Sequence, residues 1–298
     1  MEKNNNKLDL WVCETHQDSV ALSFRVENTL FSDQSPYQQV DVVQTRAHGA
    51  MLLNDGIIMV SERDEFVYHE MIAHVPLFVH PAPRRVLIIG GGDGGTAREV
   101  LRHQTVEQVV MVEIDKMVVD ACKAHIPSVA AALDDKRLEL EIDDGVKYVQ
   151  QAENRAFDVV LIDSTDPIGP AQPLFDAAFY ENVAARLTEN GIMISQSESP
   201  FYDTPIQKTM FANQRAYFDR LHMYTFANLT YPGGLWSFGF ASKGLCPLGD
   251  LDPKRVSHSG FDTRYYNPQL HWGAFSLPSF VTDNLEGLLD AVPQPRFY

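Results

Sequence analysis

The chain has 298 residues, a hydrophobic fraction of 45% and a formal net charge of −16. A nucleic acid would be repelled by this charge, so no nucleic-acid partner is expected, whereas a cationic substrate would be attracted. No apolar run approaches the roughly 18 residues of a membrane span, and the polar start MEKNNNKLDL is not a secretory signal. Together with three scattered cysteines that lack metal-ligand spacing (Cys13, Cys122 and Cys246), this composition predicts a cytoplasmic protein with no membrane segment.

Residues 1 to about 75 have the pattern of short β-strands. The strand-like segments are Val20–Phe31, Gln39–Thr45 and Gly56–Val60, and the NDG triplet at 54–56 is typical of a hairpin turn. Prolines at 76, 81 and 83 then interrupt the chain. The sequence therefore predicts a small N-terminal β domain over residues 1–75 and a second domain over residues 76–298.

After these prolines, short apolar runs alternate with segments of helix length. The apolar runs are Val86–Ile89, Val109–Ile114, Leu138–Ile142, Phe157–Asp163 and Ile192–Gln196, and the clearest helical segments are Thr96–His103 and Lys116–His125. This alternation is typical of βαβ units, so it predicts an α/β fold with a mostly parallel sheet. Two later segments, 221–229 and 235–242, are expected to form an antiparallel pair of strands.

The segment VLIIGGGDGGTAREV reads as a strand, a glycine loop and a helix. Gly90, Gly92 and Gly95 have the G-x-G-x-x-G spacing of a nucleoside-binding loop, although glycines in a purely structural turn are an alternative. Glu113 ends the next strand, where it is placed to accept hydrogen bonds from ribose hydroxyls. Asp93 would repel the pyrophosphate of a dinucleotide but attract a sulfonium nucleoside, so it favours the S-adenosyl type unless it is only a solvated loop residue.

Further acids follow the next strands. Asp144, with Gly145, is placed either to accept from the amine of adenine or to cap a helix, and the residues leave both readings open. Asp163 and Asp166, in the stretch DSTDPIGP, lie at the carboxyl end of a strand, where ligands bind in open α/β sheets. Two carboxylates this close can hold a cation, and one can accept a proton from it. A metal is not expected because no histidine lies at useful spacing, and an Asp-Pro turn is the structural alternative.

These motifs resemble the spermidine synthase family of polyamine aminopropyltransferases. The resemblance is carried by GGGDGG, VEID, DDG, DSTDPIGPA, DGIIMVSERDEFVYHEM and TYPGG, and it extends from about Trp11 to the ending YYNPQLHWGAFSLP. It implies a small N-terminal β domain joined to a Rossmann-like, methyltransferase-type domain, and a homodimer or homotetramer. It also implies decarboxylated S-adenosylmethionine as a co-substrate, no cofactor, and putrescine as the acceptor, giving spermidine and methylthioadenosine.

The resemblance also implies roles for individual residues. Asp163 matches the proton acceptor, Asp166 its partner in holding the amine, and Asp93 the acid that binds the aminopropyl amine of the donor. The matches to the polyamine groove are Tyr68, His69, Asp93, Asp163, Asp166 and Tyr231. The matches to the donor site are Gln38, Asp93, Glu113, Asp144, Gly145 and Pro170. The chain has DST where many members have DSS, and Gln39 beside Gln38 leaves the choice of glutamine less secure.

Three other functions fit parts of the pattern: an amine methyltransferase, an NAD-dependent dehydrogenase and a non-catalytic polyamine-binding protein. Asp93 argues against the first two because it would repel the carboxylate of ordinary S-adenosylmethionine or a pyrophosphate. Asp163 argues against the third because binding alone needs no proton acceptor. Agmatine is the second candidate acceptor, since Glu198 or Asp203 would supply the carboxylate that a guanidinium prefers.

Overall fold

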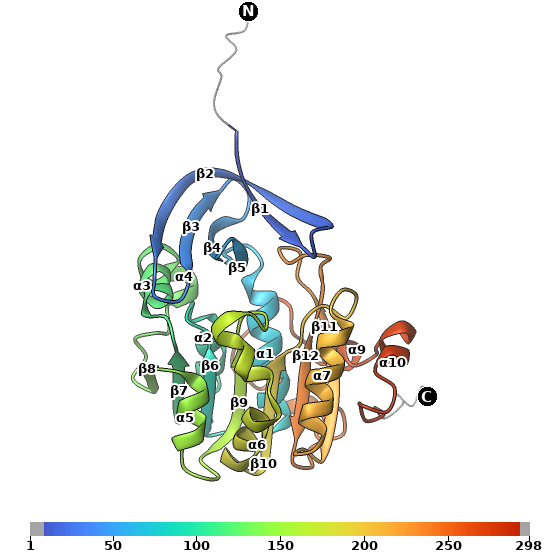
Figure 1. Cartoon of the computed structure of the whole chain (residues 1–298). Coiled ribbons are helices and arrows are strands. Elements are labelled where there is room, and N and C mark those ends of the chain that lie inside the picture. The colour runs from blue at the N-terminus through green and yellow to red at the C-terminus, as the bar shows by residue number, and fades with distance from the viewer. Residues whose placement is uncertain (1–8, 293–298) are drawn as a thin grey trace, which may run out of the picture.

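The computed structural model describes residues 9–292, which form a small sheet above a larger α/β layer (Figure 1). The small sheet has five antiparallel strands in sequence order: β1 (Leu10–His16), β2 (Val20–Gln34), β3 (Gln39–Thr45), β4 (Gly49–Asn54) and β5 (Ile57–Ser61). The predicted hairpin turn joins β4 and β5. Its residues Asp55 and Gly56 have φ angles of 49° and 82°, the left-handed conformation that a tight hairpin requires.

The second sheet has seven strands in the order β11-β12-β10-β9-β6-β7-β8. Its parallel strands are β6 (Arg85–Gly90), β7 (Gln108–Glu113), β8 (Leu138–Ile142), β9 (Phe157–Asp163) and β10 (Leu187–Gln196). The antiparallel pair β11 (Arg220–Ala227) and β12 (Leu235–Ser242) completes one edge, as the sequence predicts. The α/β fold with a Rossmann-like sheet and a separate N-terminal β sheet is therefore confirmed.

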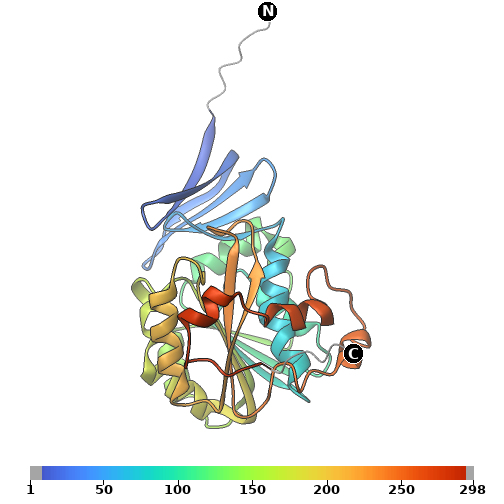
Figure 2. The same cartoon turned by 90° about the vertical axis from the view of Figure 1, so that its right-hand side faces the viewer.

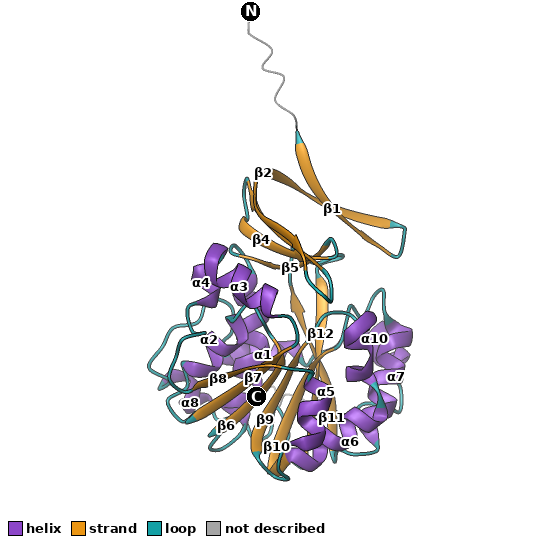
Figure 3. Cartoon of the chain, turned by 60° about the vertical axis from the view of Figure 1, so that its left-hand side comes forward, coloured by secondary structure: helices purple, strands orange, loops and turns teal. Residues whose placement is uncertain are grey.

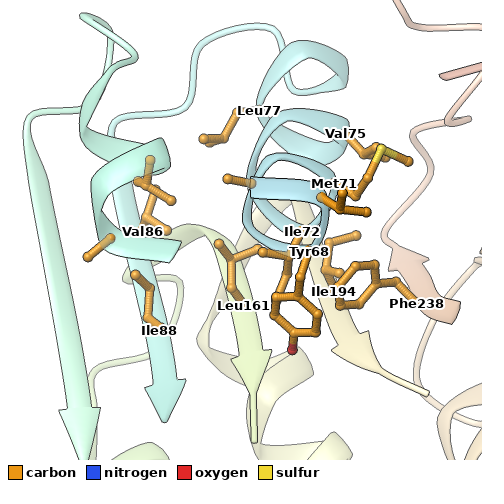
Figure 4. Packing of buried hydrophobic residues seen from close by; sticks show 14 of the residues in the cluster. Tyr68, Met71, Ile72, Val75, Leu77, Val86, Ile88, Leu161, Ile194 and Phe238 are labelled. Carbon is orange, nitrogen blue, oxygen red and sulfur yellow. The ribbon is translucent and has the colours of Figure 1, made fainter. Parts of the chain in front are cut away.

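Helix α1 (Glu65–Val79) runs through the expected domain boundary between residues 75 and 76, and Pro76 lies inside it. Every residue of α1 except Phe66 is buried, so its sequence has no polar face and shows no helical period. A proline inside a helix costs about 3 kcal/mol. The packing of α1 against the second sheet, in which Met71, Ile72 and Val75 take part, offsets that cost (Figure 4).

Helices cover both faces of the second sheet (Figure 3). One face packs on α1 and on the helices α2 (Gly95–Leu101), α3 (Lys116–His125) and α4 (Pro127–Ala130). The other packs on α5 (Gly145–Gln151), α6 (Ala177–Arg186) and α7 (Thr204–Arg215). The C-terminal segment, with α8 (Pro253–Ser257), α9 (Pro268–Ala274) and α10 (Ser279–Asn284), runs over the outside of this layer (Figure 2). Within residues 9–292, no helix has the length and apolar character to cross a membrane.

Candidate active site

A single cavity brings together all the predicted site residues. It is lined by the carboxyl ends of β6, β7 and β9, by α1, and by strands of the N-terminal sheet. The predicted residues in its lining are Gln38, Tyr68, His69, Asp93, Glu113, Asp144, Gly145, Asp163, Asp166, Pro170 and Tyr231. The position agrees with the rule that ligands of open α/β sheets bind beyond the carboxyl ends of the strands.

Glu113, at the end of β7, is fixed by two backbone groups. Its Oε2 accepts from the N–H of Gly92 at 3.1 Å and its Oε1 accepts from the N–H of Asp115 at 2.8 Å. A Cβ at position 92 would lie 2.8 Å from Oε2, so only glycine lets the loop approach this carboxylate. Burial raises the pKa of Glu113 to about 7, and the charges of Asp115 and Asp163 add to the shift.

Asp144 caps helix α5, and it also lines the cavity. Its Oδ1 accepts from the N–H of Val146 at 2.9 Å, which confirms the capping role that the sequence left open. Its proposed contact with adenine stays a prediction. Pro170 lies in the 3₁₀ helix Gly169–Phe175 that follows β9, and it also lines the cavity.

Gln38 joins the N-terminal sheet to the end of β7. Its Nε2 donates to Oδ2 of Asp115 at 3.0 Å, and the hydroxyl of Ser35 donates to the same oxygen at 2.7 Å. Gln39, by contrast, donates to Ser32 within its own sheet and is not part of the cavity lining. Of the two neighbouring glutamines, Gln38 is therefore the one placed at the site.

Asp163 ends β9 and lines the cavity. Its Oδ2 accepts from the hydroxyl of Thr96 at 2.6 Å. Burial raises the pKa of Asp163, and the charge of Asp93 raises it further, while His69, Thr96 and Tyr68 oppose the shift. A carboxylate whose charged form is destabilised in this way takes up a proton more readily, which suits a general base.

An aromatic wall faces these acids. The rings of Tyr68 and Tyr231 lie edge to face with their centroids 6.1 Å apart, and Trp236 packs on Tyr231 at 5.0 Å. The hydroxyl of Tyr231 donates to the backbone carbonyl of Met59 at 2.7 Å, which holds the ring in place. Aromatic faces of this kind accommodate both a methylene chain and a cation.

His69 and Asp93 form a pair at the edge of the glycine loop. Nε2 of His69 lies 3.4 Å from Oδ1 of Asp93, and the same oxygen accepts from the N–H of Gly95 at 2.6 Å. Burial alone would lower the pKa of His69, but the negative charges and hydrogen bonds of Asp93 and Glu65 raise it to about 10. At neutral pH this histidine is therefore an imidazolium.

Further acids surround Asp166, and the sequence did not single out all of them. Glu14, on β1, lines the cavity, and burial raises its pKa to about 7, opposed by the Ile58 N–H and assisted by Asp166. Glu198 and Asp203 are outside the lining but their charges act on Asp166 or on each other. The sequence does not predict a place for Glu14 in the site, because Glu14 lies in a short strand far from the motifs. The only feature of the sequence that would indicate it is an acid at the buried position of β1.

The fold and this cavity define a Rossmann-like α/β enzyme whose nucleoside-type pocket is lined by carboxylates. Residues 65–251 match the family model described as the spermine/spermidine synthase domain, and residues 10–62 match the spermidine synthase tetramerisation domain. The chain therefore belongs to the spermidine synthase family, and it is an aminopropyltransferase.

Individual relatives agree with this assignment over almost the whole chain. A polyamine aminopropyltransferase of Alkaliphilus metalliredigens is 46% identical over 94% of this chain and 99% of its own length. One from Clostridium beijerinckii is 42% identical over 95% and 100%. The crystal structure of spermidine synthase from Thermotoga maritima is 40% identical and superposes with a TM-score of 0.90, covering 94% of this chain and 95% of its own. A spermidine synthase in complex with the transition state analogue AdoDATO gives a TM-score of 0.91 at 40% identity, over 93% and 94%.

Proposed function

We propose that this enzyme transfers the aminopropyl group of decarboxylated S-adenosylmethionine to putrescine, forming spermidine and methylthioadenosine, with Asp163 as the proton acceptor. The observation that carries the proposal is the position of Asp163, which lines the same cavity as the carboxylate of Asp93 and the wall formed by Tyr68 and Tyr231 and acts on all three through its charge. The carboxylate of Asp93 thus suits the cationic donor, and the tyrosine rings suit an amine on a short methylene chain.

The donor is bound by groups that suit its adenosine and its amine. The Glu113 carboxylate would accept from the ribose hydroxyls, and Asp144 with Gly145 and Pro170 would enclose the adenine. Asp93 would bind the ammonium at the end of the aminopropyl chain. Gln38 would lie near the sulfonium. No cofactor or metal is needed, because the positive sulfur already makes its neighbouring carbon electrophilic.

The reaction is a displacement at the methylene carbon next to the sulfonium. Each amino group of putrescine in solution is mostly protonated at neutral pH, so the attacking group must first lose a proton. Asp163 accepts that proton, the amine nitrogen forms a bond to the methylene carbon, and the carbon–sulfur bond breaks. Its electron pair stays on sulfur, which leaves as neutral methylthioadenosine. Alignment of the two reactants supplies much of the remaining acceleration.

The second ammonium of the acceptor would be held beside Asp166. Burial raises the pKa of Asp166, Glu198 and Asp203, and the charge of Asp203 adds to the shift of the other two. A cation placed beside Asp166 would relieve the repulsion between Asp166 and these neighbouring carboxylates. The tyrosine rings would cover the methylene groups between the two nitrogens.

Agmatine is the second candidate acceptor, and the contacts of the outer acids favour putrescine over it. Asp203 already accepts from Nε2 of Gln17 at 3.1 Å and lies 3.5 Å from Nε2 of His16. Glu198 accepts from Nε2 of Gln196 at 3.2 Å. Carboxylates with these partners are less free to form the bidentate pair that a guanidinium prefers.

The tetramerisation model that matches residues 10–62 supports assembly as a homotetramer or, at least, a homodimer. Three free cysteines support a cytoplasmic location. Neither feature enters the chemistry proposed above.

The test of the acceptor is a comparison of kcat/KM for putrescine, cadaverine, agmatine and spermidine with the same donor. We expect putrescine to be preferred. A tenfold preference for agmatine or spermidine, which is about 1.4 kcal/mol of transition-state stabilisation, would overturn the acceptor while leaving aminopropyl transfer intact. A reaction mixture without enzyme serves as the control for uncatalysed transfer.

A further inference from the structure

A row of buried charges leads from the cavity into the layer between α1 and α2. His69 contacts Asp93 through Nε2, and its Nδ1 lies 2.6 Å from Oε2 of Glu65, one turn earlier on α1. The same Oε2 accepts from the guanidinium of Arg98, on α2, at 2.7 Å. The side chains of Glu65 and His69 are 7% and 3% exposed, so these contacts are little screened by water.

The glycine loop is shaped to admit the ring of His69. A Cβ at Gly95 would lie 2.2 Å from Cε1 and 2.3 Å from Nδ1 of His69, so any other residue there would displace the imidazole. The last glycine of the loop therefore serves the histidine rather than a phosphate. The ring is consequently confined by Gly95 on one face and tethered at both nitrogens.

We propose that Glu65 is a positioning residue for the transfer reaction: fixed by Arg98, it holds His69 doubly protonated and aimed at Asp93, so that Asp93 keeps one oxygen for the amine of the donor. The proposal rests on the function proposed above. Oδ1 of Asp93 is occupied by Gly95 and His69. Within residues 9–292 its Oδ2 makes no hydrogen bond, and the residue faces the cavity. Glu65 itself is not part of the cavity lining, so it acts only through His69.

The charges that face His69 come from four elements. They are Glu65 on α1, Asp93 in the loop after β6, Asp163 at the end of β9, and Arg98 on α2 behind Glu65; the neighbouring ring of Tyr68 is neutral. Burial alone would raise the pKa of Glu65, but hydrogen bonds and charges of His69 and Arg98 outweigh it and lower that pKa. Glu65 is thus a fixed negative charge over the working range of pH.

Loss of that charge would leave Asp93 as the main group that raises the pKa of His69, so the imidazole would become neutral at a lower pH than in the native protein. A neutral imidazole has one N–H, and when Nδ1 keeps it, Nε2 turns a lone pair toward Oδ1 of Asp93. Asp93 then loses a charged donor and gains a repulsive neighbour, and its carboxylate shifts away from the position that binds the donor. The effect grows with pH because it follows deprotonation of His69.

The first measurement is a histidine NMR titration of the ligand-free protein, with the His69 signal assigned by its loss in His69→Asn. We expect His69 to remain protonated at pH 8.5. A His69 that titrates near 6.5, the ordinary value for histidine, would overturn the proposal even if every Glu65 variant failed to fold.

The second measurement is calorimetric binding of decarboxylated S-adenosylmethionine, without acceptor, from pH 7 to pH 9. Because Glu113 also titrates near this range, the quantity compared is the ratio of Kd for Glu65→Gln to Kd for the native protein at each pH. We expect this ratio to rise at least fivefold across the range. Glu65→Asp, which retains the charge, should show a constant ratio.

Glu70→Gln is the matched control. Glu70 is a buried glutamate on the same helix, but its carboxylate accepts from the backbone of residues 264–266 and is not part of the cavity lining. The Glu70→Gln protein should be less stable than the native protein, but the pH dependence of its donor binding should be unchanged. A Glu65→Gln protein that behaves like Glu70→Gln would make Glu65 merely structural. Since acceptor and turnover are absent, failure of the putrescine or Asp163 assignment leaves this result unaffected.

Discussion

Replacing Asp163 by asparagine tests the proposed chemistry with little change in shape. The amide oxygen of asparagine can still accept from the hydroxyl of Thr96, which lies 2.6 Å from the native carboxylate, but the amide cannot take a proton from the amine. General bases contribute roughly 10² to 10⁴ in rate, so turnover should fall by about 10²-fold or more. Donor binding should change far less.

The same substitution should not weaken the ligand-free fold. The pKa of Asp163 is raised in the folded protein, so at neutral pH its ionisation destabilises the folded state relative to the unfolded chain. Asp163→Asn removes that cost and the repulsion from Asp93. The melting temperature at pH 7 should therefore be equal to or above that of the native protein.

The assay measures the steady-state rate of methylthioadenosine formation with saturating donor and a varied concentration of putrescine, alongside calorimetry of the donor. Asp166→Asn, three residues along, is the comparison: it should raise the KM of putrescine more than it lowers kcat. Native-like turnover in folded Asp163→Asn would refute the role of Asp163 as base. An equal loss in donor affinity and in rate would reassign it to binding.

Three further outcomes are expected. Asp93→Ala should weaken the decarboxylated donor by about 1.5–3 kcal/mol, the loss of a charged hydrogen bond, and should spare ordinary S-adenosylmethionine in calorimetry; equal losses would contradict selectivity. The donor should bind more tightly to native protein at pH 8 than at pH 6. The reason is that Glu113, with a pKa of about 7, accepts from the ribose hydroxyls only when it is ionised. Glu113→Gln should therefore abolish the difference in donor affinity between the two pH values. Glu14→Gln should stabilise the ligand-free protein at pH 8 by about 1–3 kcal/mol but should have no such effect at pH 4. The reason is that the pKa of Glu14 is raised to about 7 in the folded protein, so its ionisation costs stability as the pH rises from 4.5 to 7. An equal gain in stability at both pH values would contradict a raised pKa of Glu14.

The parallel part of the fold was predictable because its central strands are buried on both faces. Runs such as VVMVE in β7 and FDVVLID in β9 then become continuously apolar and end in an acid where the sheet ends. Helix α1 was not predictable by the same reasoning. It is buried all round, so it lacks the polar face that reveals a surface helix, and its proline reads as an interruption.

The site residues also fall into a group that the sequence pattern predicts and a group that it does not. Glu113, Asp144 and Asp163 follow from strand ends, since the sheet itself brings those ends together. Tyr68, His69 and Tyr231 were assigned only through family resemblance, because their meeting depends on α1 and on the β11–β12 connection. Glu14 reaches the cavity through the placement of the N-terminal sheet, which no local pattern encodes.

The most direct test of the proposed function is the product balance of purified enzyme with decarboxylated S-adenosylmethionine and putrescine. The account predicts that methylthioadenosine and spermidine appear in equal amounts and that neither forms when putrescine is omitted. Methylthioadenosine without spermidine, or a different aminopropylated product formed in preference when putrescine competes with the other amines, would contradict it.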